Sequence, residues 1–234
     1  TDDLFEYFQN LPLDSFTEDL DHAHLEAGMD IYGICMGLVG GNLRAILTEE
    51  EGKTIQYWDL RAQEIIGTID ITAEETNVPL FGNEAEGCVI DDENEHIIIS
   101  REGMRGILND YDANTLKFIK VIDSRSGNIG GDPEGVTIYK TTDKEGFIIV
   151  SSQGDSKFNL YNRQFPFDYI RSFTVNDVTD TDGIDVTNKA IDDLYTQGFL
   201  VVQDGYNSPD NQNFKIVDME QVLKKKVKNP GSTD

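Results

Sequence analysis

Oxygen-bearing side chains recur beside glycines along this sequence, each time where an apolar run begins. The pattern occurs at Tyr32-Gly33, Glu86-Gly87, Glu134-Gly135 and Asp182-Gly183. A second apolar run follows each of them and ends at another polar side chain: Glu51, Glu102, Gln153 and Asp204. Carboxylate and amide oxygens, with no cysteine or histidine at matching places, favour a hard cation, Ca²⁺ first and Mg²⁺ second.

The elements that carry these residues form a repeat. The glycines at 33, 87, 135 and 183 are separated by 54, 48 and 48 residues. Several short strands in each unit of about this length are typical of a β-propeller blade. The sequence therefore predicts an all-β fold with about four four-stranded blades, at about residues 29–77, 78–125, 126–175 and 176–224.

Blade geometry predicts that the polar residues converge. The first strand of a blade lies nearest the central axis and the second returns antiparallel, so its end lies beside the start of the first. We expect the opening acids, which include Asp132 as well as Glu134, to form one acidic rim with the residues that end the second strands. Glu-Gly and Asp-Gly are also good turn formers, but that explains one or two such places and not a set of four.

The amino-acid composition limits the kinds of partner that this protein can bind. The 234 residues include 44 acidic and 19 basic ones, which gives a net charge of −25. Nucleic acid and anionic membrane surfaces are therefore poor partners, and no apolar run is long enough to span a membrane. Residues 1–28 are acidic, and Leu4-Phe5-Glu6-Tyr7-Phe8 within them is a candidate outer strand. Residues 225–234 form a basic tail.

Other kinds of site find little support. The pair His22 and His24 has no matched partner elsewhere in the sequence, so it is a weak metal motif. Val178 to Lys189 fails the EF-hand pattern because neither end supplies an acidic ligand. The sequence has no histidine suited to a Ser-His-Asp triad and no Gly-x-x-x-x-Gly-Lys phosphate loop.

Two cysteines occupy nearly equivalent places in adjacent repeats. Cys35 lies two residues after Gly33, and Cys88 lies one residue after Gly87. Neighbouring inner strands could bring them together as a disulfide. Buried free thiols are the favoured prediction, because cysteine behaves as a small apolar residue in protein interiors.

The same stretches resemble the β-propeller phytases, calcium-dependent enzymes that hydrolyse myo-inositol hexakisphosphate (phytate). The resemblance runs in family order from about Met29 to Leu223. Its matching stretches are Ile31 to Met36, Glu84 to Glu93, Asp132 to Tyr139, Ser151 to Ser156, Tyr161 to Gln164, Asp180 to Val186, Val202 to Gly205 and Asn211 to Val217.

The resemblance implies roles for the rim. Calcium ligands would be Tyr32, Glu51, Glu86, Glu102, Asp132 and Glu134, with Asp182, Asp204 and the Asn211–Asn213 loop holding more tightly bound calcium. Catalysis would rest on Glu134, Glu86 and Tyr32, and substrate binding on Gln153, Lys157 and Arg101. Metal-activated water would then attack phosphorus directly, with Glu134 as a proton donor to the leaving group.

This chain departs from the family pattern in two ways. The family has six blades, of which this chain matches about the C-terminal four. Glu50-Glu51 also stands where the family has a Lys-Glu pair, so Lys53, Arg101 or Lys157 would have to supply the cation. Two functions follow: a calcium-dependent 3-phytase acting on a calcium–phytate complex, or an incomplete, non-catalytic propeller fragment that binds calcium and phosphate.

The missing blades and the family have further implications. Four blades of a six-bladed ring would leave open edges that invite self-association. The N-terminus lacks the basic and apolar regions of a signal peptide. The resemblance implies a secreted or periplasmic protein.

Overall fold

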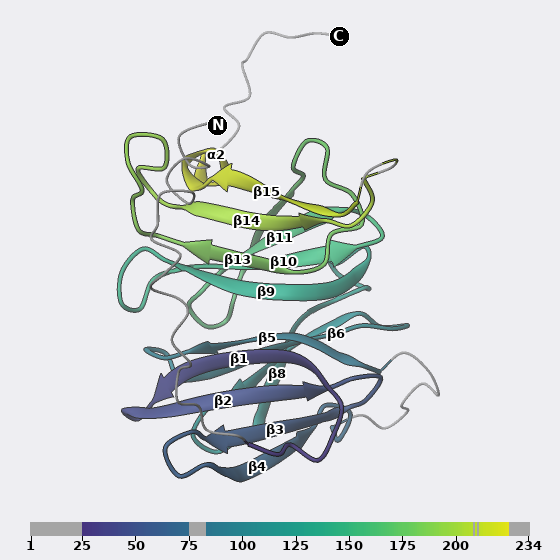
Figure 1. The fold of residues 1–234 in the computed structure, drawn as a ribbon, viewed down its shortest axis with the longest axis vertical. Coiled ribbons are helices and arrows are strands. Elements are labelled where there is room, and N and C mark those ends of the chain that lie inside the picture. The colour runs from purple at the N-terminus through teal and green to yellow at the C-terminus, as the bar shows by residue number, and fades with distance from the viewer. Residues whose placement is uncertain (1–24, 75–82, 208, 210, 225–234) are drawn as a thin grey trace, which may run out of the picture.

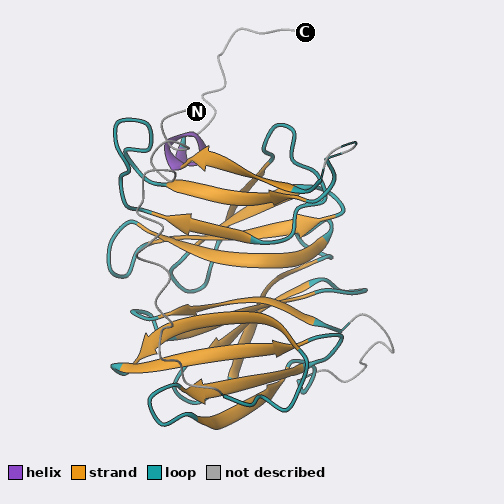
Figure 2. Ribbon diagram, viewed as in Figure 1, coloured by secondary structure: helices purple, strands orange, loops and turns teal. Residues whose placement is uncertain are grey.

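A computed structural model describes residues 25–74, 83–207, 209 and 211–224 of the chain. This part is almost entirely β-structure, with one short helix near its C-terminal end (Figure 2). The candidate strand at Leu4 to Phe8, the pair His22 and His24, and the basic tail 225–234 lie outside the described residues. No helix among the described residues is both long and apolar enough to cross a membrane.

The first two blades are four-stranded antiparallel sheets with strands in sequence order. The first consists of β1 (Ile31–Val39), β2 (Asn42–Glu49), β3 (Thr54–Asp59) and β4 (Glu64–Asp70). The second consists of β5 (Ala85–Asp91), β6 (His96–Arg101), β7 (Ile107–Asp112) and β8 (Phe118–Ser124).

The third blade repeats this arrangement, and the fourth differs from it. The third consists of β9 (Asp132–Lys140), β10 (Gly146–Gln153), β11 (Lys157–Asn162) and β12 (Tyr169–Phe173). The fourth consists of β13 (Ile184–Thr187), β14 (Phe199–Asp204) and β15 (Asn213–Asp218), followed by helix α2 (Met219–Leu223). Within the described residues the fourth sheet thus has three strands, where the repeat predicted four.

The inner strands β1, β5, β9 and β13 contact one another in that order, which places the blades side by side (Figure 1). The chain therefore has the predicted all-β fold, a propeller of four blades. Each sheet lies within one predicted blade range, and the exact boundaries between blades stay a prediction.

The core lies between the blades, in three clusters that each join two neighbours. Strand β6 shows why the sequence produces this arrangement. Alternate side chains of a strand point to opposite faces; Ile97 and Ile99 pack toward the first blade, whereas Ile98 packs toward the third. An uninterrupted apolar run is therefore what a strand buried on both faces requires.

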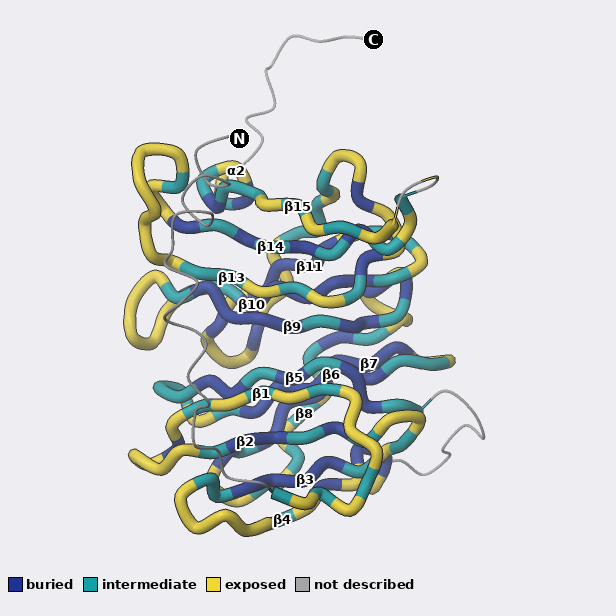
Figure 3. The backbone as a smooth tube through the Cα atoms, viewed as in Figure 1, coloured by how far each residue is buried: buried dark blue, intermediate teal, exposed yellow. Residues whose placement is uncertain are grey.

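The two outer faces of the set of blades remain exposed. On β1, Ile34 and Met36 are 65% and 61% exposed, and on β15 Phe214 and Ile216 are 72% and 48% exposed. Both strands are exposed along much of their length (Figure 3). Such runs of apolar side chains are uncommon on the surface of a complete domain.

Cys35 and Cys88 form a disulfide between β1 and β5, with their Cα atoms 5.8 Å apart. The prediction of free thiols was therefore wrong. The reason is the alternation of the inner strands. Equivalent positions of successive blades face the same way around the propeller, so a residue of β1 that faces the second blade meets a residue of β5 that is offset by an odd number of positions. Cys35 and Cys88, offset by one position in the repeat, therefore both lie in the apolar cluster between the first two blades.

Candidate functional site

The paired oxygen-bearing residue and glycine of each repeat form a β-bulge in the inner strand. Two residues of the inner strand lie opposite one residue of the second strand at three places. These are Tyr32-Gly33 opposite Thr48, Glu86-Gly87 opposite Ser100, and Glu134-Gly135 opposite Ser151. A bulge redirects a side chain and bends the strand, and bulges are frequent next to active sites.

The bulges direct their side chains into a common pocket of about 200 Å³ at one edge of the blades. It is lined by Tyr32, Glu50, Glu51, Glu84, Glu86, Glu102, Glu134, Gln153 and Asp182. These residues come from all four blades, so the pocket exists only when the blades are assembled. Every polar side-chain atom in this lining is oxygen, apart from the amide nitrogen of Gln153.

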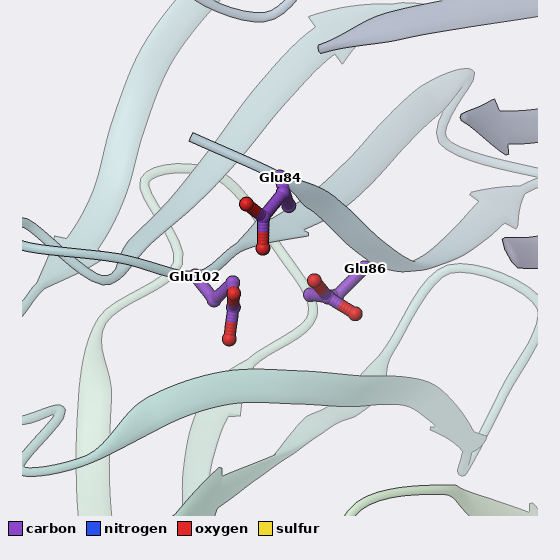
Figure 4. Close-up of side chains that lie close together, drawn as sticks. All are labelled: Glu84, Glu86 and Glu102. Atoms are coloured by element: carbon purple, nitrogen blue, oxygen red, sulfur yellow. The ribbon is translucent and has the colours of Figure 1, made fainter. Parts of the chain in front are cut away.

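Three glutamates form the tightest group within the pocket (Figure 4). One carboxylate oxygen from each of Glu84, Glu86 and Glu102 lies within 4.8 Å of the others. Glu86 is buried and the other two are partly buried. Carboxylates this close repel one another unless protons or cations bind between them.

The charges of the pocket alter its acid–base behaviour. Burial, followed by the negative charges of Glu86, Asp182 and Glu102, raises the pKa of Glu134 to about 9. A hydrogen bond with Glu84, followed by burial, raises the pKa of Glu102 to about 8. In the metal-free pocket at neutral pH these two carboxyls therefore hold protons.

The pKa values of three other pocket residues are shifted in the same direction. Burial raises the pKa of Glu86 and of Asp182. Burial and the charge of Glu86 also raise the pKa of the Tyr32 hydroxyl, which hydrogen-bonds to the Glu86 carboxylate. Tyr32 thus keeps its proton, and its hydroxyl is fixed at the centre of the acidic group.

Seven of the residues predicted for the site line this pocket: Tyr32, Glu51, Glu86, Glu102, Glu134, Gln153 and Asp182. Sequence reasoning gave no role to Glu50 and Glu84. The period of a strand could have indicated Glu84, because residues two apart lie on the same side, and Glu84 precedes Glu86 by two.

The structure places the other predicted residues elsewhere. Asp132 accepts hydrogen bonds from the Arg125 guanidinium and, at 3.1 Å, from the backbone N–H of Gly103. Lys157 pairs with Asp155 at 2.8 Å on the surface. Arg101 is 1% exposed and donates to the backbone carbonyl of Ile71 at 3.1 Å. None of the lysines and arginines in the described part of the chain lines the acidic pocket.

A second, larger pocket of about 410 Å³ lies on the fourth blade. It is lined by Asp182, Gly183, Gln203, Gln212, Asn213 and Phe214. The side-chain oxygens Oε1 of Gln203 and Oδ1 of Asn213 are buried and have no hydrogen-bond partner among the residues that the structure describes. Asp204, which was predicted as a ligand, is buried nearby; it accepts from the Thr179 N–H at 3.1 Å and lies 3.4 Å from the Lys215 ammonium.

A β-propeller whose blades converge on a pocket of carboxylates is the class that the fold and the site define. The profile of the phytase family matches residues 25–231, and the chain belongs to that family. A 3-phytase from Bacillus subtilis (strain 168) is 31% identical over 195 residues, which cover 78% of this chain and 50% of the relative. The chain thus spans about half the length of this relative.

A comparison of structures supports the fold alone. The chain resembles hydrazine synthase from Kuenenia stuttgartiensis, with a TM-score of 0.60 at 14% sequence identity. The match covers 87% of this chain and 50% of the other. At this low identity the likeness concerns the β-propeller and not its chemistry.

Proposed function

We propose that the acidic pocket is a calcium-dependent phosphomonoesterase site that acts on phytate as its calcium complex. The observation that carries this proposal is the convergence of seven acidic side chains from four blades on one pocket whose lining, in the described residues, includes no lysine or arginine. A polyanionic phosphate ester cannot enter such a pocket unless cations accompany it. Membership of the phytase family supports the same substrate class.

The residues present fit a hard cation. The Glu84–Glu86–Glu102 group offers oxygen ligands at close range, and oxygen donors are those that calcium prefers. The unpartnered oxygens of Gln203 and Asn213 fit a second cation on the fourth blade. Calcium bound at such sites would neutralise the phosphate groups and activate the attacking water.

The chain's own groups have distinct roles in this proposal. Glu86, Glu102 and Asp182 bind the cations, and Glu51 and Glu50 extend the binding surface at the rim. The Gln153 amide N–H donates to a phosphate oxygen. Water attacks phosphorus, the bond from phosphorus to the inositol oxygen breaks, and the inositol oxygen takes the proton of the Glu134 carboxyl. The products are inorganic phosphate and a lower inositol phosphate.

A second candidate function is the capture of calcium and phosphate without catalysis. It is favoured by the share of the relative that this chain covers, 50%, because further site residues of a complete enzyme can lie in the other half. The absence of basic side chains from the pocket lining in the described residues points the same way.

Phosphate release from phytate in the presence of calcium decides between the two functions. We expect release that stops on addition of excess chelator and falls by about 100-fold or more in Glu134→Gln, which lacks the transferable proton. Glu64→Gln on the exposed strand β4 is the matched control and should behave as the unchanged protein. No release by the unchanged protein would leave only the capture function, and equal release by the unchanged protein and Glu134→Gln would refute the role of Glu134 as proton donor.

We further propose secretion or a periplasmic location. The Cys35–Cys88 disulfide supports this, since disulfides persist in oxidising compartments.

A further inference from the structure

A hydroxyl side chain lies opposite each of the three bulges, on the second strand of the same blade. The three residues are Thr48 on β2, Ser100 on β6 and Ser151 on β10. All three are fully buried. They occupy the same register position in each blade. None of the three belongs to the lining of the acidic pocket.

Each hydroxyl bonds to the bulge of the next blade. Thr48 donates to the backbone carbonyl of Glu86 at 3.1 Å, and Ser100 donates to the backbone carbonyl of Glu134. Ser151 donates to the backbone carbonyl of Asp182 at 2.5 Å. The three carbonyls belong to the three acids that open the inner strands of the second, third and fourth blades.

The same hydroxyls also contact the bulge of their own blade. Thr48 accepts from the Gly33 N–H at 2.8 Å. Ser100 and Ser151 lie 2.9 Å from the Gly87 carbonyl and 3.3 Å from the Gly135 carbonyl. Thr48 thus hydrogen-bonds on both sides of a blade interface, whereas Ser100 and Ser151 donate their single hydroxyl proton to the next blade and contact the carbonyl of their own blade.

The bulge glycines make room for this contact. A Cβ atom on Gly33 would lie 2.8 Å from the Glu86 carbonyl oxygen, and one on Gly87 would lie 2.5 Å from the Glu134 carbonyl oxygen. Gly135 would meet the Asp182 carbonyl at 2.8 Å. Any larger residue would separate the blades and move the acids apart.

We propose that Thr48, Ser100 and Ser151 are positioning residues, which fix the backbone of Glu86, Glu134 and Asp182 so that the Glu86 and Asp182 carboxylates meet in one cation site with the Glu134 carboxyl beside it. The inference rests on the proposed function, because it concerns the geometry of that site. Strands of separate sheets share no backbone hydrogen-bond ladder that would align their carboxylates, although the Gly135 N–H donates to the Asp182 carbonyl at 3.3 Å across the interface of the third and fourth blades. The hydroxyl bridges add to the alignment at all three interfaces, and outer groups that orient ligands typically change metal affinity by about 10–100-fold when they are removed.

Thr48 offers the cleanest test, because valine keeps its shape and removes only the hydroxyl. The probe is Ca²⁺ alone, titrated into metal-free protein by calorimetry, with unfolding measured in parallel to show that each variant is folded. We expect Thr48→Val to weaken calcium binding at the pocket by about tenfold. Thr48→Ser retains the hydroxyl and should bind as the unchanged protein does. Ser100→Ala and Ser151→Ala should act in the same direction as Thr48→Val.

Thr137→Val is the matched control. Thr137 is also buried, and its hydroxyl also bridges two blades, donating to the Asp185 carboxylate at 3.2 Å. It contacts no bulge, so we expect a loss of stability with calcium affinity unchanged. An equal loss of affinity in Thr137→Val, or unchanged affinity in Thr48→Val, Ser100→Ala and Ser151→Ala, would overturn the inference.

A failure of the proposed function would give a different set of calcium titrations from a failure of the positioning role. In that case the unchanged protein and Glu86→Gln would give the same calcium titration, and the positioning role would fall with it. If the unchanged protein binds calcium through Glu86 and only the hydroxyl variants are indifferent, the function stands and the positioning role is refuted.

Discussion

His96 is the residue for which the structure predicts pH-dependent stability away from the acidic pocket. Its Nδ1 lies 2.8 Å from a carboxylate oxygen of Asp110, whose side chain is fully buried. This hydrogen bond and the charges of Asp110, Asp91 and Asp112 raise the pKa of His96. The positive charge of Lys120 lowers the pKa of Asp110, and Arg163 binds Asp91. The negative charges that face His96 are therefore partly neutralised by nearby cations.

The sign of the pH dependence follows from that shift. A pKa that is higher in the folded state than the unfolded value near 6.5 means that protonated His96 favours folding. We expect its contribution, about 1 kcal/mol, to be complete below about pH 6.5 and lost as the pH rises through the folded-state pKa. Urea unfolding at several pH values measures it. His96→Gln keeps a donor for Asp110 but does not titrate, so the difference between the pH profiles of the two proteins isolates the histidine. Identical pH profiles for the unchanged protein and this variant would contradict the prediction.

At the residue scale, the types of the site residues were easier to predict than the directions in which their side chains point. The acids at the start of the inner strands could be predicted because the repeat places them at equivalent positions, and Glu86, Glu134 and Asp182 do meet. The position of the Arg101 side chain could not be predicted, because it depends on which face of β6 each alternate residue occupies. Arg101 is the last residue of β6 and lies between Ser100 and Glu102 in sequence. Asp132 lies two residues before Glu134 in sequence, yet Arg125 binds its carboxylate outside the pocket.

At the scale of elements, the interface between the first and second blades combines apolar packing with a covalent bond. Cys35 and Cys88 join β1 to β5 across 53 residues of sequence. A bond that closes a loop of this length restricts the unfolded chain and typically adds about 2–4 kcal/mol of stability. It also ties the bulge that carries Tyr32 to the bulge that carries Glu86.

We therefore expect the double variant Cys35→Ala/Cys88→Ala to lose about 2–4 kcal/mol in unfolding free energy. Chemical denaturation followed by the fluorescence of Trp58, which lies on β3 of the first blade, is the measurement. Reduction of the unchanged protein should reproduce the loss, and a reducing agent should leave the double variant unaffected. Equal stability with and without the bond would refute this prediction.

At this scale the strands could be predicted from the sequence, but the β-bulges that interrupt their pairing could not. The alternation and length of the apolar runs indicate the strands because both reflect burial of one or two faces. A β-bulge, by contrast, is defined by a count of residues on two strands at once. The sequence of one strand does not contain that count, so the redirection of the acids could not be derived from it.

At the scale of the whole molecule, the exposed apolar faces on β1 and β15 are the main feature that sequence analysis anticipated only in outline. Four repeats predicted four blades, and the comparison with the longer family pattern predicted open edges. Which side chains those edges expose depends on strand direction, and Figure 3 shows that much of β1 is exposed. The chain's net charge of −25 opposes association between copies, so salt should promote it.

We expect copies of this chain to associate through these faces at high concentration and moderate salt. Sedimentation at increasing protein concentration measures the association, and Ile34→Lys/Met36→Lys should reduce it by placing charges on the apolar face of β1. Met104→Lys changes a side chain that is 76% exposed on a loop and should have no effect. A monomer at all concentrations, or equal association by both variants, would contradict this expectation.

The hydroxyl bridges have a consequence for how this architecture could be divided and recombined. Each bridge runs from the second strand of one blade to the inner strand of the next, so the unit that keeps an acid in place is not a sheet. It extends from Thr48 to Gly87, from Ser100 to Gly135, and from Ser151 to Gly183. On the fourth blade Gln203 follows Val202, the partner of Ile184, and so takes the corresponding place; its Oε1 is buried without a partner in the described structure. Grafts or circular permutations cut between sheets would sever every bridge they cross, whereas cuts in the turns between first and second strands would keep each hydroxyl together with the acid of the next blade.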